Sequence, residues 1–344
     1  MTELKSKKES KMAIIEVKDL VKKYKISQKE HGILGYIKHL FHPKYKEQIA
    51  VNNINFNIEE GELVGYIGEN GAGKSTTIKM LTGLLTPTSG EVIVNGIIPN
   101  EKRIQNNKQI GAVFGQKTQL WWDLPVIESF RLIKKMYDIP EGEYRKNLKK
   151  FTEILNLEEL LDKQVKNLSL GQKMRCEIAA TFLHNPKVVY LDEPTIGLDI
   201  LVKENIRKFI KDINKEKKTT VILTTHDLKD IEDVCDRIIL LDKGKIIYDG
   251  EKEVFKNTYG KHIIAEFIIQ NKNANITLET SEEEFELIEE NENNLKVKFN
   301  HDKFTIIDIV NSISKYCEIL DMHIQEEGLE EILKEIYRGE VIND

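Results

Sequence analysis

Residues 68–75 of the chain read Gly-Glu-Asn-Gly-Ala-Gly-Lys-Ser, which matches the phosphate-binding pattern GxxxxGK[ST]. An apolar run at residues 63–67 predicts a buried strand before it, and residues 75–81 are predicted to form the helix after it. The glycines let the backbone turn tightly, so that successive N–H groups converge on phosphate oxygens, and the helix adds the positive end of its dipole. Lys74 can then reach the β- and γ-phosphates, and the Ser75 hydroxyl can ligate Mg²⁺. This strand–loop–helix context argues against a chance match in a glycine-rich turn.

A second motif is an apolar strand that ends in two carboxylates, at residues 188–193 (VVYLDE). A buried strand of this kind would deliver Asp192 beside the phosphate loop, where it can hold Mg²⁺ directly or through water. Glu193 would then orient and deprotonate the attacking water. Adjacent acidic residues at a strand end can also mark an ordinary loop. Paired with the phosphate loop, however, they predict a P-loop NTPase.

A third motif identifies the kind of NTPase. Residues 168–172 read LSLGQ, directly before a helix predicted at 173–183. Here the chain resembles the ATP-binding subunits of ABC transporters, whose signature LSGGQ stands in this order and spacing, and the resemblance covers about residues 13–250. Leu170 replaces the usual central glycine, and leucine disfavours a positive φ at that position. Ser169 and Gly171, the residues expected to face a γ-phosphate, are retained, so only affinity or closure rate is expected to differ.

The resemblance implies further roles, residue by residue. Gln116 stands where the family has its Q-loop glutamine, Asp199 resembles the D-loop aspartate, and His226 resembles the switch histidine. Tyr24 stands where an aromatic side chain stacks on adenine, although a strand tyrosine can also simply pack on the sheet. The implied nucleotide-binding residues are Tyr24, Gly68, Glu69, Asn70, Gly71, Ala72, Gly73, Lys74, Ser75 and Thr76. The implied catalytic residues are Lys74, Gln116, Glu193 and His226, and the implied Mg²⁺ ligands are Ser75, Gln116 and Asp192.

The resemblance also implies partners. In the family each signature faces the phosphate loop of another chain, so Ser169, Gly171 and Gln172 would act on the opposite protomer of a homodimer or of a pair with a close paralogue. The other partner would be an integral membrane permease on a separate chain, and similarity to bacterial export-type systems favours export. A soluble ABC ATPase with a non-transport role is the alternative. It is disfavoured because the chain has one ATPase unit and no long coiled coil. A P-loop kinase would lack the signature.

Composition sets the cellular context. The chain has 344 residues, of which 40% are hydrophobic, and no run of apolar residues long enough to cross a bilayer. The N-terminus lacks a secretory signal, and the three scattered cysteines show neither metal-binding spacing nor a disulfide pattern. We therefore expect a cytoplasmic protein, peripheral on the inner face of the cell membrane. Residues 262–344 hold 20 acidic and 7 basic side chains. This acidic end indicates a separate domain and argues against nucleic acid as a partner.

The predicted fold class is α/β, with a P-loop NTPase core of ABC ATPase type. An antiparallel β subdomain, a helical signature subdomain at about residues 117–184 and a small α+β C-terminal domain complete it. The domains are expected at 13–260 and 261–344, after a disordered stretch at 1–12. In the last domain we expect strands at 262–269 and 295–299, helices at 306–316 and 329–337, and a solvated acidic face at 282–290.

Two segments remain open to more than one interpretation. Residues 26–49 are an insertion with a basic helical stripe at 32–41, which is either a surface helix near the membrane partner or a decorative helix. Leu120, Trp121 and Trp122 follow the Q-loop. They form either the core of the helical subdomain or a groove for a cytoplasmic helix of the membrane subunit.

Overall fold

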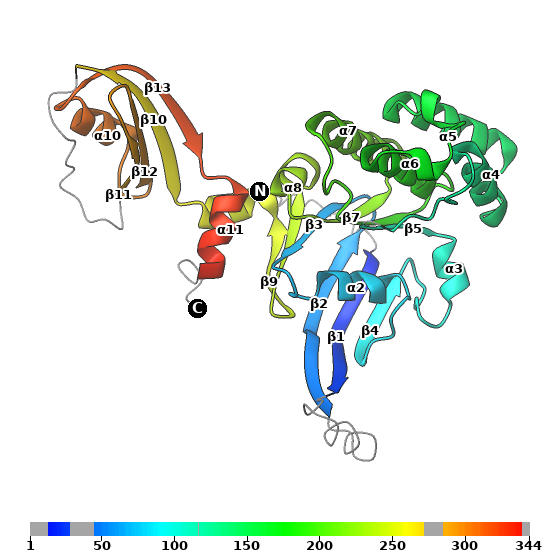
Figure 1. Cartoon of the computed structure of the whole chain (residues 1–344). Helices are drawn as coiled ribbons and strands as arrows, with labels where there is room; N and C mark the ends of the chain where they lie inside the picture. The colour runs from blue at the N-terminus through cyan, green and yellow to red at the C-terminus, as the bar shows by residue number, and fades with distance from the viewer. Residues whose placement is uncertain (1–12, 28–44, 116, 272–284, 339–344) are drawn as a thin grey trace, which may run out of the picture. The chain divides into compact units, whose positions relative to one another are not determined.

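The computed structural model describes residues 13–27, 45–115, 117–271 and 285–338 (Figure 1). Gln116, the stretch at 1–12 and the helical stripe at 32–41 lie outside these residues. The chain divides into two compact units, Met1–Gly250 and Glu251–Asp344. Two described sheets belong to the first unit and one to the second, and each unit has its own hydrophobic core.

A six-stranded sheet forms the centre of the first unit, in the order β5-β6-β7-β3-β8-β9. The first five strands of that order pair in parallel, and β3, β6 and β7 are buried along nearly their whole length. Buried parallel strands of this kind read as continuous apolar runs, which is why the sequence reveals them. The predicted α/β core is confirmed. The strands are β3 (Leu63–Gly68), β5 (Ile110–Phe114), β6 (Val188–Asp192), β7 (Thr220–Thr224), β8 (Arg237–Asp242) and β9 (Lys245–Glu251).

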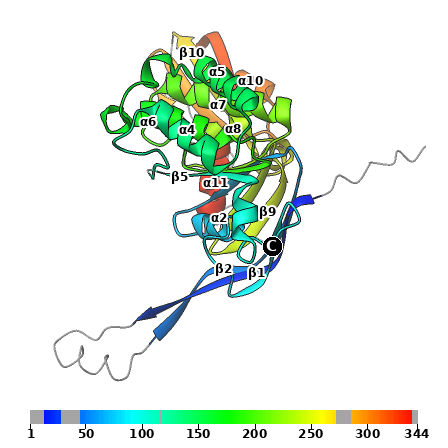
Figure 2. The ribbon, with the colours of Figure 1, turned by 90° about the vertical axis from the view of Figure 1, so that its right-hand side faces the viewer.

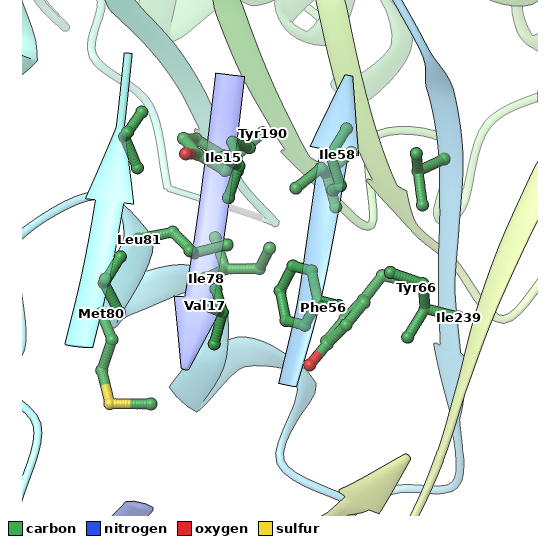
Figure 3. Packing of buried hydrophobic residues seen from close by; sticks show 14 of the residues in the cluster. Ile15, Val17, Phe56, Ile58, Tyr66, Ile78, Met80, Leu81, Tyr190 and Ile239 are labelled. Carbon is green, nitrogen blue, oxygen red and sulfur yellow. The ribbon is translucent and has the colours of Figure 1, made fainter. Parts of the chain in front are cut away.

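The predicted antiparallel subdomain is a three-stranded sheet in the order β2-β1-β4. Figure 3 shows side chains of this sheet packed against helix α2 and against Tyr66 of β3. The sheet therefore supports the helix that follows the phosphate loop. Its elements are β1 (Ala13–Ser27), β2 (Tyr45–Glu59) and β4 (Ser89–Val94), and the helix is α2 (Lys74–Leu81).

The strands β1 and β2 extend further than the sequence suggested. Ser27 is paired with Tyr45, so residues 26–27 and 45–49 belong to the sheet and are not part of an inserted loop. Beyond Val21, which pairs with Ser89 of β4, the two strands continue together as a two-stranded ribbon (Figure 2). Tyr24 lies on this ribbon.

Helix α6 contacts α4, α5 and α7, and α5 also contacts α7 (Figures 1 and 2). Helix α6 begins at Leu170, earlier than the predicted 173, because the Ser169 side chain caps its first turn. Two short 3-10 turns, at Glu158–Leu160 and Val165–Asn167, lead into it. The helices described in this unit are α2, α3 (Arg103–Asn107), α4 (Val126–Met136), α5 (Glu141–Leu155), α6 (Leu170–Phe182), α7 (Ile200–Lys217) and α8 (Leu228–Val234).

In its described residues, the second unit is an antiparallel sheet in the order β11-β12-β10-β13 with three helices. Phe267, Val297 and Phe299 alternate inward and pack with Ile309 and Ile313 of α10. The unit starts at Glu251 and not near 261, because α9 packs against α11. Its elements are α9 (Lys252–Tyr259), β10 (His262–Gln270), β11 (Phe285–Glu290), β12 (Asn294–Asn300), α10 (Ile306–Ile313), β13 (Glu318–Glu326) and α11 (Leu329–Arg338).

Two strands of this unit were not predicted. Residues 285–290 form β11 and pair with β12, so this part of the predicted acidic face is a strand, and its side chains at 286, 288 and 289 are exposed as expected. Strand β13 pairs with β10, but nearly all of its side chains are exposed. Leu320, Met322 and Ile324 alternate with polar residues along β13, but their side chains are exposed, so this alternation does not mark a face buried in the core.

Candidate nucleotide-binding site

The phosphate loop connects the end of β3 to the start of α2, as predicted. Gly73 has a φ of 109°, and a Cβ there would lie 2.5 Å from the carbonyl oxygen of Ala50. Only glycine therefore fits at this position. The Lys74 ammonium is buried and donates hydrogen bonds to the carbonyl oxygens of Gly68 (2.5 Å) and Glu69 (3.1 Å). Burial lowers the pKa of Lys74, and the nearby carboxylates of the site oppose that shift.

Asp192 lies at the carboxyl end of β6, next to this loop. The Ser75 hydroxyl donates to Asp192 Oδ2 at 3.2 Å, and the Thr224 hydroxyl donates to Asp192 Oδ1 at 2.5 Å. Carboxylate and hydroxyl oxygens are hard ligands of the kind that Mg²⁺ prefers. The donor set that the structure brings together therefore fits this ion. Thr224 was not predicted as part of the site; its position opposite Asp192 in the β6–β7 register is the signal that identifies it.

Glu193 and His226 form a pair. His226 Nε2 lies 3.1 Å from Glu193 Oε1, and the backbone N–H of His226 donates to Oε2 at 3.3 Å. Burial raises the pKa of the Glu193 carboxyl, while His226 and Lys74 act in the opposite direction. Glu193 also has a φ of 57°, which is uncommon for a residue other than glycine. Glu193 thus combines a carboxyl of raised pKa with a backbone of positive φ.

These groups share one cavity of about 260 Å³. Most of the predicted phosphate-loop residues line it, together with Asp192, Glu193 and His226, whereas Gly68 and Ala72 do not. Ala50, from β2, lines it without having been predicted, because nothing in its residue type indicates a function. The lining residues are Ala50, Glu69, Asn70, Gly71, Gly73, Lys74, Ser75, Thr76, Asp192, Glu193 and His226.

Tyr24 does not line this cavity. Its side chain on β1 is 38% exposed, and the Lys22 ammonium lies 5.6 Å from the centre of its ring. The ring is therefore partly exposed on the ribbon, and packing on the sheet stays the alternative. Its role toward adenine stays a prediction.

The signature residues lie outside the cavity of their own chain. The Ser169 side chain accepts a hydrogen bond from Gln172 N at 3.3 Å, and Gln172 Oε1 accepts one from Ser169 N at 3.0 Å. Leu170 occupies the first helical position of α6 without a positive φ and is 42% exposed. Asp199 likewise caps α7 by accepting a hydrogen bond from Val202 N at 3.0 Å.

The two tryptophans are exposed, which contradicts the core alternative for them. Leu120 is buried, but Trp121 and Trp122 are 38% and 52% exposed. The Lys173 ammonium lies 4.2 Å from the centre of the Trp122 ring and holds it by a cation–π contact.

The three cysteines are buried, as expected of inert core residues. Burial raises the pKa of the Cys176 thiol to about 12, so little reactive thiolate forms near neutral pH. Among the described residues, no helix combines the length and the apolar character needed to cross a membrane.

A protein-family model described as ABC transporter matches residues 51–196. The chain is 39% identical over 227 residues to the energy-coupling factor transporter ATP-binding protein EcfA2 of Clostridium perfringens, covering 64% of this chain and 80% of the relative. It is 30% identical over 292 residues to the linearmycin resistance ATP-binding protein LnrL of Bacillus subtilis, covering 84% of this chain and 93% of that one. The ABC transporter ATP-binding protein NatA of Bacillus subtilis is 30% identical, with 62% and 86% covered.

Solved structures agree with these relatives. An ATP-binding subunit of an ABC transporter superposes with a TM-score of 0.60 at 27% identity, covering 72% of this chain and 93% of that one. A dimeric ATP-binding cassette in a post-hydrolysis state, bound to ADP and Pi, gives a TM-score of 0.57 at 29% identity, with 69% and 98% covered.

Proposed function

The chain belongs to the family of ABC transporter ATP-binding proteins, and from this premise we propose that its residues bind MgATP and hydrolyse it to drive a separate integral membrane permease. One observation carries the assignment of residues. A single cavity gathers Lys74, Ser75, Asp192, Glu193 and His226, which supply a cation, two oxygen ligands, a base and its hydrogen-bond partner. Together they meet the needs of phosphoryl transfer to water.

In the proposed reaction, Glu193 accepts the proton of the attacking water. Its two carboxylate oxygens contact His226 Nε2 and the backbone N–H, so its orientation is fixed before substrate arrives. Lys74 and the N–H groups of the phosphate loop would hold the β- and γ-phosphates. Ser75 and Asp192 would hold Mg²⁺, together with Gln116 by family resemblance, and the bound ion would neutralise phosphate charge.

A second ATP-binding subunit would complete the site. Ser169, Gly171 and Gln172 do not line the cavity of their own chain. A dimeric cassette is among the similar solved structures, which supports a pair in which each signature faces the other chain's phosphate loop. The partner would be a second copy or a close paralogue, and the pair would lie on the cytoplasmic face of the membrane against the permease.

Export is the proposed direction. Of the relatives described above, the linearmycin resistance protein aligns along the greatest share of this chain. ATP-dependent uptake of substrate into cells by the assembled complex would disprove this direction.

As the pH is lowered, ATP hydrolysis should slow at a higher pH than it would if the base were a glutamate of ordinary pKa. Burial raises the pKa of Glu193, and only the carboxylate form accepts a proton, so kcat should fall as the pH drops through that raised pKa. The measurement is kcat at saturating MgATP over a buffer series from about pH 5 to 8. ATP binding measured at the same pH values separates loss of the base from loss of substrate. A kcat that stays constant down to the pKa of an exposed glutamate would contradict the assignment.

Trp121 and Trp122 should matter for transport and not for nucleotide binding. Both rings are exposed beyond the Q-loop, where they can receive a helix of the permease. We expect changing both to alanine to abolish most ATP-driven transport in the assembled complex while the affinity for ATP stays within about twofold. Trp122→Phe retains an aromatic face and is the matched control. An equal loss of thermal stability and of ATP binding would instead show that the rings support the fold.

A further inference from the structure

The buried carboxylate of Asp230, in the first turn of α8, takes no part in the mechanism above. Asp230 is only 1% exposed to solvent. It accepts hydrogen bonds from the hydroxyls of Thr195 and Thr225, the latter at 3.1 Å, and from Arg207 Nε at 2.6 Å. A carboxylate removed from water must be paired in this way, and its bonds are stronger in the low-dielectric interior.

Each of the two hydroxyls belongs to a segment with a proposed function. Thr195 lies between Glu193 and Asp199, on the segment that leads from the base to the D-loop. Thr225 directly precedes His226, and its hydroxyl also accepts a hydrogen bond from Asp227 N at 3.0 Å. Thr225 therefore shapes the turn that presents His226 to Glu193, and Asp230 connects this turn to the D-loop segment.

Helix α7 reinforces this connection. Asp199, Lys203 and Arg207 follow one another at intervals of four, which places them on one face of the helix. Asp199 caps the helix, Lys203 pairs with Asp227 at 2.6 Å, and Arg207 pairs with Asp230. The helix that begins at the D-loop is thus held against the start of α8, directly after the turn at Thr225, His226 and Asp227, which we call the switch loop.

We propose that Asp230 is a positioning residue that holds the D-loop segment and the switch loop together as one unit. Contact between the D-loop and a second subunit then acts on the orientation of the Glu193–His226 pair through the Thr195 and Thr225 hydroxyls. The inference rests on the proposed function. It adds to it a physical connection between the dimer contact and the base.

The test removes one hydroxyl at a time. Thr195→Val and Thr225→Val keep the shape of the side chain, and Thr195→Ser and Thr225→Ser keep the hydroxyl. In the full-length protein, we expect each valine variant to lower kcat about tenfold with KM for ATP within about twofold, and each serine variant to restore most of the rate. Both hydroxyls act through one carboxylate, so kcat of the double valine variant should fall about as much as in either single variant. Two independent effects would instead multiply to about a hundredfold.

Asp230→Asn removes the charge and should lower kcat at least as much as either valine variant. Asp233→Asn is the matched control. Asp233 also pairs with Arg207, at 3.0 Å, but contacts neither threonine, so its variant should retain the wild-type rate. Strictly additive losses in the double variant, or serine variants that fail to restore the rate, would overturn the proposal. Failure of the wild-type protein to hydrolyse MgATP would instead refute the proposed function itself, which keeps the two failures distinguishable.

Discussion

Glu193→Gln is expected to slow ATP hydrolysis by at least about a hundredfold while ATP still binds. The amide has nearly the shape of the carboxylate, and its oxygen can still accept the hydrogen bond from the His226 backbone. It cannot take up a proton, so water attack loses its base. Because hydrolysis would no longer follow closure, a dimer should accumulate in the presence of ATP, with each signature covering the other chain's nucleotide.

The measurements for this variant are phosphate release at saturating MgATP, ATP binding, and size-exclusion chromatography with and without ATP. Glu60→Gln makes the same chemical change at an exposed position of the first unit and should behave as wild type. If Glu193→Gln stayed monomeric with ATP and kept most of its turnover, Glu193 would not be the base.

Lys74→Ala should weaken ATP binding by roughly ten- to a hundredfold, the usual cost of losing hydrogen bonds to a charged group. The Lys74 ammonium is buried at the base of the cavity and holds two carbonyl oxygens of the loop before any phosphate arrives. Its loss therefore removes both a phosphate ligand and a support of the loop. Arginine should not restore binding, since a planar guanidinium does not fit where a compact ammonium is enclosed.

Lys79→Ala is the matched control for this effect, because Lys79 lies on the same helix α2 with an exposed side chain. Equilibrium ATP binding and thermal unfolding of both variants would separate loss of a ligand from loss of the helix. An affinity for ATP that changes less than twofold in Lys74→Ala would exclude the proposed phosphate contact.

The sequence was most informative where one local pattern fixes both structure and chemistry. The phosphate loop and the strand that ends in Asp192 are contiguous motifs, and the sheet brings them to one cavity as predicted. Thr224 and Asp230 were missed because their roles depend on which strands and helices are neighbours. Threonine at the end of a strand and aspartate in a first helical turn are common residues, and only the contacts with Asp192, Thr195 and Thr225 distinguish these two.

Strand boundaries were the features least well predicted from the sequence, for a related reason. The ribbon of β1 and β2 runs through residues 26–27 and 45–49, and the exposed side chains at 26 and 45–49 leave no core-facing pattern. Strand β13 is exposed in the same way: Leu320, Met322 and Ile324 alternate along it but face away from the core, and its pairing with β10 establishes the strand. Backbone pairing that buries few side chains is not visible in a single sequence.

The left-handed backbone of Glu193 implies a conflict between folding and turnover at one position. A non-glycine residue in such a conformation costs on the order of 1–3 kcal/mol, which glycine would avoid. Stability alone would therefore favour losing the side chain that the reaction needs most. The chain retains glutamate at this residue, and so gives up part of its stability to hold a base against the nucleotide.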